Sequence, residues 1–419
     1  MDKQKKCIYC GSFGPFSDEH VFPAGMGGDD KDYILIDLVC AECNTVTFSK
    51  LELSLMRRSP TGLGRNFMQS KSRERGGQTA KPSIETRNRY VIDEFGRLLE
   101  SEEDKNGVET ILAQCYFEGE KIYYTAQDSL HLKKMYDALE IALSKTTINM
   151  IKKITSKSFE VTVYEWTNDK YEFIKKETVN KPPTIGIWVD SPSENTQNFK
   201  PRFFQKLKGQ LVLKTDNNES HTVLLRSMRR TLPSILQKHA DVQPNTIKNP
   251  MVQVEMVVDM QEAERAIAKI GFNFFIHTLG GYAANEAECN GIKSSILRGT
   301  PELPFSSFGE DAQEVVSDLF GIPPQKCHCV MLFAIPSGPN TRDIYFNAKL
   351  YGSGAHKVLI ARTTTFSGLE DPIYFIINYE TNKIEKLSML EYQLKHGTLI
   401  NRFQTNLTRE KFDRLPKTS

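Results

Sequence analysis

Two short motifs near the amino terminus, CIYC at residues 7–10 and CAECN at residues 40–44, decide how the first part of the chain folds. Between them lies SDEHVFP at residues 17–23. Cysteines paired two residues apart supply thiolate ligands at the spacing that a tetrahedral zinc ion requires. One such pair is weak evidence, but two pairs around a Glu-His dipeptide, with an Asn after the last cysteine, form a specific pattern. The sequence therefore predicts a structural zinc site formed by Cys7, Cys10, Cys40 and Cys43.

The residues around these motifs predict a β-hairpin followed by a helix. A short strand carries Glu19 and His20, and residues 33–39 have the apolar character of a returning strand. A helix is expected from about Thr47. On a helical wheel Glu52 lies at the edge of the apolar stripe, so its side chain is able to face the hairpin.

These residues resemble the HNH, or ββα-metal, endonucleases. The layout is most similar to the zinc-stapled branch that includes recombination endonuclease VII, and to uncharacterised bacterial HNH proteins. The resemblance covers residues 5–58. It implies that His20 is the general base, that Glu19 binds a catalytic divalent ion, and that Asn44 helps to hold this ion or orients the histidine ring. The family has a third residue, His or Asn, on the helix; this chain has Glu52 there, which we assign as a further ligand of that ion.

Hydrolysis of a phosphodiester explains why such residue types are needed. A neutral histidine can take the proton of the attacking water, and a cation stabilises the charge that develops on the phosphorane and the leaving oxygen. Oxygen ligands favour Mg²⁺ or Mn²⁺ over zinc at that position. Three alternatives stay open: a zinc ribbon that grips nucleic acid without cutting it, an ordinary strand position for His20, and an ordinary helix-face position for Glu52.

Composition places the chain among ordinary globular proteins. Its 419 residues predict two or three domains, and 39% apolar with 25% charged residues is unexceptional. We find neither an apolar run of membrane-spanning length nor a signal-peptide core, and four of the eight cysteines are scattered. These features predict a cytoplasmic protein with reduced thiols and no membrane contact. The net charge of +2 is uninformative, so any nucleic-acid signal must be local.

A basic segment follows the motif. Residues 57–89 hold nine Lys and Arg side chains against two Glu, a net charge of +7, and its Gly and Pro residues disfavour a long helix. Beside a nuclease motif such a segment is suited to contacting a phosphate backbone, and its contribution should weaken as salt rises. The alternative is a solvated linker. The candidate nucleic-acid contacts are Arg57, Arg58, Arg65, Lys71, Arg73 and Arg75.

The rest of the chain predicts helices packed on an antiparallel sheet. Helical spacing extends over residues 129–154 and 261–279. The CHC motif at residues 327–329 is interpreted as structural rather than metal-binding, because neighbouring strand residues point to opposite faces. Strands are expected over residues 329–335, 343–350, 357–362 and 373–377, among others.

The sequence thus predicts an α+β protein, an amino-terminal zinc-stapled HNH module followed by a larger α+β region with an antiparallel sheet. We expect a metal-dependent endonuclease that cuts DNA in preference to RNA and acts in restriction or antiviral defence, either as a homo-oligomer or with a defence-system partner. The expected domains are the HNH module over residues 1–58, a basic linker over 59–105, an α+β region over 106–255, and helices with an antiparallel sheet for target recognition or sensing over 256–419.

Overall fold

The described residues of the computed structural model form two compact units. Residues 86–256 form unit 2, and the segments before and after them together form unit 1. This division differs from the expected four consecutive parts, because the amino-terminal residues belong to the same unit as the carboxyl-terminal ones. The structure describes residues 5–72, 81–104, 106–119, 121–192, 199–216, 221–238, 246–307, 320–321, 323–352, 354–363, 369 and 371–396.

Unit 1 begins with the expected hairpin and helix. Strand β1 (Phe16–His20) pairs antiparallel with β2 (Ile34–Cys40). A turn of π-helix (Cys43–Phe48) leads directly into α1 (Ser49–Arg57). Helix α2 (Pro60–Met68) follows in what we expected to be a linker. The local reason is a start signal, since Pro occupies the first turn and the Ser59 hydroxyl accepts a hydrogen bond from the Gly62 N–H.

The second half of unit 1 has the expected helices and antiparallel sheet. The expected helix over residues 261–279 is confirmed as α5 (Met260–Leu279). Two 3₁₀ turns (Gly281–Asn285 and Ala287–Cys289) join it to α6 (Asn290–Arg298), and α8 (Met389–His396) comes last. The sheet has the order β15-β18-β17-β16-β19-β20, and every pairing in it is antiparallel. Its strands are β15 (Phe305–Ser307), β16 (Cys327–Pro336), β17 (Arg342–Lys349), β18 (Ala355–Thr363), β19 (Ile373–Asn378) and β20 (Lys383–Ser388).

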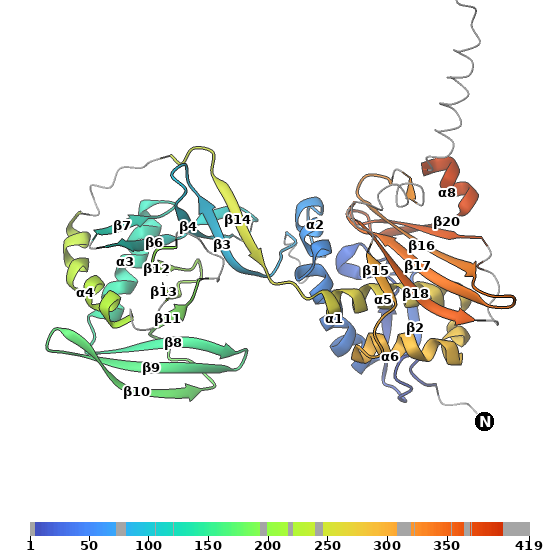
Figure 1. Cartoon of the computed structure of the whole chain (residues 1–419), viewed down its shortest axis with the longest axis horizontal. Helices are drawn as coiled ribbons and strands as arrows, with labels where there is room; N and C mark the ends of the chain where they lie inside the picture. Colours follow the sequence, from blue (N-terminus) through green and yellow to red (C-terminus); the bar gives the residue numbers. More distant parts are fainter. Residues whose placement is uncertain are drawn as a thin grey trace, which may run out of the picture. The chain divides into compact units, whose positions relative to one another are not determined.

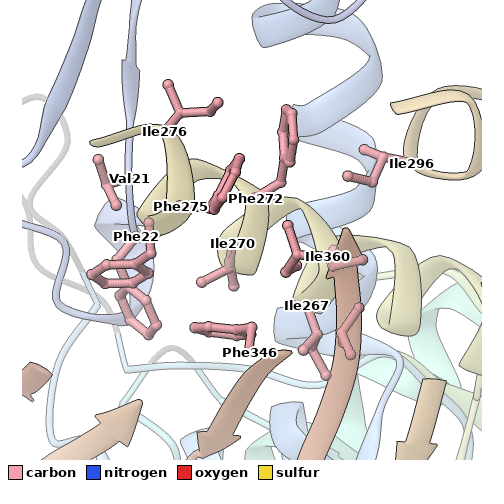
Figure 2. Packing of buried hydrophobic residues seen from close by; sticks show 14 of the residues in the cluster. Val21, Phe22, Ile267, Ile270, Phe272, Phe275, Ile276, Ile296, Phe346 and Ile360 are labelled. Carbon is pink, nitrogen blue, oxygen red and sulfur yellow. The ribbon is translucent and has the colours of Figure 1, made fainter. Parts of the chain in front are cut away.

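Helix α5 is the centre of unit 1 (Figure 1). It contacts α1 and β2 of the amino-terminal segment and β16, β17 and β18 of the sheet. Figure 2 shows how Phe22 from the amino-terminal segment, Ile270 from α5 and Phe346 from β17 meet in one apolar cluster. Because these side chains share a core, the amino-terminal motif does not fold around the cysteines alone.

Glycine at position 271 permits this close packing. A Cβ atom there would lie 2.6 Å from Cδ1 and 2.8 Å from Cβ of Phe346. Gly27 has a similar role in the loop after β1, since its φ is +104° and a Cβ atom there would lie 2.6 Å from the Cα of Tyr379.

The described part of unit 2 folds into an eight-stranded sheet, a four-stranded sheet and the helices α3 and α4 (Figure 1). In the eight-stranded sheet, of order β10-β9-β8-β11-β13-β12-β6-β7, β11 runs parallel to both of its neighbours. The four-stranded sheet has the order β14-β3-β4-β5. The elements are β3 (Thr86–Ile92), β4 (Leu98–Glu103), β5 (Glu109–Ile111), β6 (Ala113–Glu118), β7 (Lys121–Thr125), α3 (Ser129–Leu143), β8 (Thr147–Thr155), β9 (Ser158–Thr167), β10 (Lys170–Val179), β11 (Ile187–Asp190), β12 (Arg202–Gln205), β13 (Leu211–Lys214), α4 (His221–Lys238) and β14 (Met251–Met256).

Two expectations for this region were wrong. Residues 129–154 were predicted as one helix, but α3 ends at Leu143 and β8 takes over from Thr147. The segment TINMIKKIT is rich in β-branched residues, which favour a strand. The expected linker over residues 59–105 instead contributes α2, β3 and β4. None of the helices that the structure describes combines the length and apolarity needed to cross a membrane.

Candidate functional site

The four cysteines of the two motifs lie together. Their sulfur atoms are all within 4.8 Å of one another. Cys10 Sγ is 3.5 Å from Cys40 Sγ, and Cys7 Sγ is 4.0 Å from Cys43 Sγ. Zinc–sulfur bonds of about 2.3 Å in a tetrahedron place sulfurs about 3.8 Å apart. The cluster therefore fits a structural metal ion such as zinc.

One cysteine of the cluster ionises readily. Contact with Cys43 lowers the pKa of Cys7 to about 4, although burial opposes this shift, whereas the same contact raises the pKa of Cys43 and burial raises that of Cys40. A thiol that ionises this readily is a good metal ligand, because zinc binds the thiolate. No disulfide forms in the described part of the chain, where all eight cysteines are free.

The first cysteine loop is attached to α5 by Tyr9. Its hydroxyl donates a hydrogen bond of 2.5 Å to Oδ1 of Asn273. The ring packs edge-on against Phe48, with centroids 4.6 Å apart, and against Phe272 at 5.3 Å. The buried side chain of Tyr9 thus links the cysteine cluster to α5 by a hydrogen bond and by ring packing.

A groove with a volume of about 820 Å³ is lined by the end of β1, the π-helical turn and α1, among other segments. Its lining brings together all four residues that the sequence assigned to catalysis or to the catalytic ion: Glu19, His20, Asn44 and Glu52. Three cationic residues, Arg57, Arg65 and Lys81, line the same groove. The groove belongs to unit 1 entirely.

His20 lies at the end of β1 and is partly exposed. Its Nε2 is 2.7 Å from Oδ1 of Asp30. The side chain of His20 is 25% exposed, so the ring remains accessible from the groove. A carboxylate on one ring nitrogen fixes the tautomer and leaves Nδ1 to act as the basic nitrogen. This pair can remove a proton from water.

Glu19 and Glu52 are joined by a lysine that we did not predict. Lys269 of α5 forms ion pairs with the carboxylates of Glu19 and, at 2.6 Å, of Glu52. Burial lowers the pKa of Lys269, but the two carboxylates outweigh it and the net shift is upward. Burial raises the pKa of Glu19, and the ammonium of Lys269 opposes this shift without reversing it. Because the ammonium lies against both carboxylates, we take Lys269 as protonated and Glu19 as ionised.

Asn273, one turn further along α5, completes this contact. Its Nδ2 donates to Oε1 of Glu19 and to the backbone carbonyl of His20, both at 3.0 Å. Lys269 is paired with the same Oε1 atom of Glu19. Helix α5 therefore holds the end of the strand that carries His20.

The Nδ2 group of Asn44 forms hydrogen bonds with β1. It donates to the hydroxyl of Ser17 at 3.1 Å and to the carbonyl of Asp18 at 2.8 Å. These bonds attach the π-helical turn to β1, two residues before His20. Asn44 thus positions the strand that presents the histidine.

The ligand set that the sequence assigned to Mg²⁺ or Mn²⁺ does not fit such an ion. The space between Glu19 and Glu52 holds the ammonium of Lys269. Within the described ranges the four cysteines are the single group of three or more His, Cys, Asp or Glu side chains close enough to share an ion. A second cation beside the ammonium would be repelled in this buried setting.

Comparisons of the chain with family models, with curated proteins and with solved structures returned no match.

The basic segment contributes cations of two kinds. Arg58 pairs with Glu85, and Arg65 is buried, with its guanidinium bonded to the carbonyl of Gly25 and the hydroxyl of Ser72. Burial lowers the pKa of Arg65. By contrast, the exposed side chains of Arg57, Lys71 and Lys81 have no ion pair with the residues that the structure describes. The expected contacts Arg73 and Arg75 lie outside the described residues.

Sequence reasoning missed Asp30, Lys269 and Asn273. Asp30 gave no signal beyond its place in the acidic run DDKD over residues 29–32. Lys269 and Asn273 gave a readable one, because they are one turn apart within the apolar face of a strong helix. Polar side chains in such a position need buried partners.

Proposed function

We propose that the chain hydrolyses phosphodiester bonds of nucleic acid, preferably DNA, in the groove that contains His20. The observation that carries this proposal is the composition of one groove: the His20 ring paired with Asp30, the carboxylate of Glu52, and the cations of Arg57 and Lys81, which have no ion pair among the described residues. A base and phosphate-binding charges in one concave site are what this reaction requires.

The proposed reaction begins with a proton transfer to His20. Nδ1 takes a proton from water, and the water oxygen forms a bond to phosphorus as the bond from phosphorus to the 3′-oxygen breaks. Solvent supplies a proton to the leaving oxygen. Asp30 accepts a hydrogen bond from Nε2–H and stabilises the imidazolium. Arg57 and Lys81 neutralise charge on the phosphate.

The family resemblance adds Mg²⁺ or Mn²⁺ to this proposal, and we route no step through such an ion because Lys269 lies between its assigned carboxylates. Antiviral defence or restriction and a homo-oligomeric or defence-system partner belong to the same proposal and rest on the resemblance, whereas the proposed cytoplasmic location rests on the composition of the sequence.

Plasmid cleavage tests the proposal. Supercoiled DNA, single-stranded DNA and RNA are incubated with the protein in Mg²⁺, in Mn²⁺ and without added divalent ion. Replacing His20 by Ala should lower the cleavage rate by about 10² to 10⁴-fold, the usual contribution of a general base. The matched control is His131→Ala, which removes a similar His–Asp pair from unit 2. Cleavage that survives the loss of His20 would contradict its role.

A second candidate is a zinc-ribbon protein that binds nucleic acid without cutting it. The observation that favours it is that Lys269 occupies the space between Glu19 and Glu52 and offsets part of their charge, while basic side chains line the groove. Salt-sensitive binding of DNA, equal in the wild type and His20→Ala, with no cleavage of any nucleic acid, would establish this candidate in place of the hydrolase.

A further inference from the structure

Lys269 is fully enclosed at the contact between α5 and the amino-terminal segment. Its side chain is 0% exposed, whereas that of Glu52 is 21% exposed and borders the groove. The ammonium also lies 5.3 Å from the centre of the Phe48 ring. A buried charge in this position requires its partners, because an unpaired ammonium is costly to take out of water.

The charges around Lys269 define what the floor of the groove can bind. Two carboxylates and one ammonium leave a single net negative charge. A hard divalent ion between the same carboxylates would lie within a few ångströms of the ammonium, with little water to screen the repulsion. The ion would also have to displace the hydrogen bond from Asn273 to Oε1 of Glu19.

The position of Lys269 is held from several sides. Asn273 on the same helix binds Glu19 and the His20 carbonyl, and Tyr9 binds Asn273 in turn. Two turns before Lys269 on the same helix, Glu262 forms an ion pair with Lys50 of α1. Lys269 is therefore part of the packed interior.

We propose that Lys269 is the resident cation of this groove, so that Glu19 and Glu52 bind no divalent ion and the reaction proceeds without Mg²⁺ or Mn²⁺ between them. This inference rests on the proposed function for its catalytic part only. Lys269 does not touch a substrate. It is a positioning residue, because its ion pair with Glu19 helps to fix the end of β1, which carries His20.

Direct binding of Mn²⁺ tests the inference independently of activity. Electron paramagnetic resonance of the zinc-loaded full chain should show no Mn²⁺ bound at Glu19 and Glu52. Lys269→Met should create a Mn²⁺ site that is lost again when Glu52→Gln is added, whereas Lys269→Arg should not. Lys293→Met is the matched control, since this partly buried lysine of α6 donates to the carbonyl of Ala284 rather than to carboxylates.

Stoichiometric Mn²⁺ binding by the wild type that Glu52→Gln abolishes would overturn the inference, even if Lys269→Met fails to fold. The activity arm compares cleavage with and without added Mg²⁺ while zinc content is measured. Cleavage that continues without added Mg²⁺ supports the inference. Cleavage that requires Mg²⁺, combined with Mn²⁺ binding by the wild type, overturns it. Failure to cleave any substrate would reject the proposed hydrolase and leave the Mn²⁺ result to decide the role of Lys269.

Discussion

His328 joins two segments of unit 1 that are 302 residues apart in the chain. Its Nε2 donates to the carbonyl of Met26, and its Nδ1 accepts from the N–H of Tyr351, both at 3.1 Å. Burial lowers its pKa to about 3. Both ring nitrogens form hydrogen bonds in the neutral form. Protonation would add a hydrogen to Nδ1, which would then face the N–H of Tyr351 and break that hydrogen bond.

Unit 1 should therefore lose stability in mild acid. The unfolded chain takes up a proton on His328 near pH 6.5, and the folded chain resists until about pH 3, so stability falls as pH decreases between these values. The expected contribution is a loss of about 2 kcal/mol between pH 7 and pH 5. Denaturant unfolding at several pH values measures it, and His328→Phe should have a shallower dependence. An unchanged slope would contradict this.

Single residues were predictable where their chemistry is local. The spacing of the four cysteines and the Glu-His dipeptide made them recognisable in the sequence. The four cysteines lie together, and the residues assigned to catalysis line one groove. Lys269 was not assigned, because its partners are more than two hundred positions away and no short motif encodes such a contact. For the same reason the carboxylates of Glu19 and Glu52 were assigned to an ion.

Among the elements, α5 packs closely against Phe346 of β17 at Gly271. Replacing Gly271 by Ala should destabilise unit 1 by about 1 to 3 kcal/mol, because the new methyl group would overlap Phe346. Helix propensity alone would favour Ala by about 1 kcal/mol, so the sign of the change identifies the packing effect. Denaturant unfolding provides the measurement.

Gly291→Ala in α6 is the control for that comparison. A Cβ at this position meets nothing within 4 Å, so Ala should be neutral or stabilising by up to about 1 kcal/mol. If both substitutions stabilised the protein equally, the close approach of α5 to β17 would be refuted.

Element types followed from periodicity where the pattern was strong, as in α5 and strands β16 to β19. The predictions of element type were wrong where a helical and a strand pattern overlapped. The helical spacing that starts in α3 extends by chance into β8, and sheet pairing with β9 and β11 decides in favour of a strand. Likewise α2 was hidden because glycines suggested a linker, although Ser59 and Pro60 begin a helix.

At the scale of the molecule, the zinc cluster should stabilise all of unit 1. Cys40→Ser should remove the metal and unfold unit 1, because the amino-terminal residues share their core with α5 and the six-stranded sheet. Unit 2 has a core of its own and should stay folded. Zinc analysis with limited proteolysis checks this: protection confined to residues 86–256 is expected, and unchanged zinc content would contradict the assignment.

The expectation of an independent amino-terminal module had a physical basis, but this basis does not apply to the observed fold. Small zinc modules often fold alone, and the motif occupies residues 5–58. In this chain Phe22, Phe48 and Leu55 are buried in the same cluster as α5, which no local pattern reveals. Sequence patterns therefore located the site and its elements, whereas the long-range contacts that complete it required the structure.

The insertion of unit 2 into unit 1 also has a consequence for the order of biosynthesis. A ribosome releases the cysteine motifs and His20 first, then the whole of residues 86–256, and α5 only afterwards. During that interval Glu19 has no ammonium beside it and Phe22 has no core to enter. A polypeptide that terminates prematurely before Lys269 thus carries the earliest residues of the groove without the late ones, and translation must run well past its midpoint before the groove can assemble.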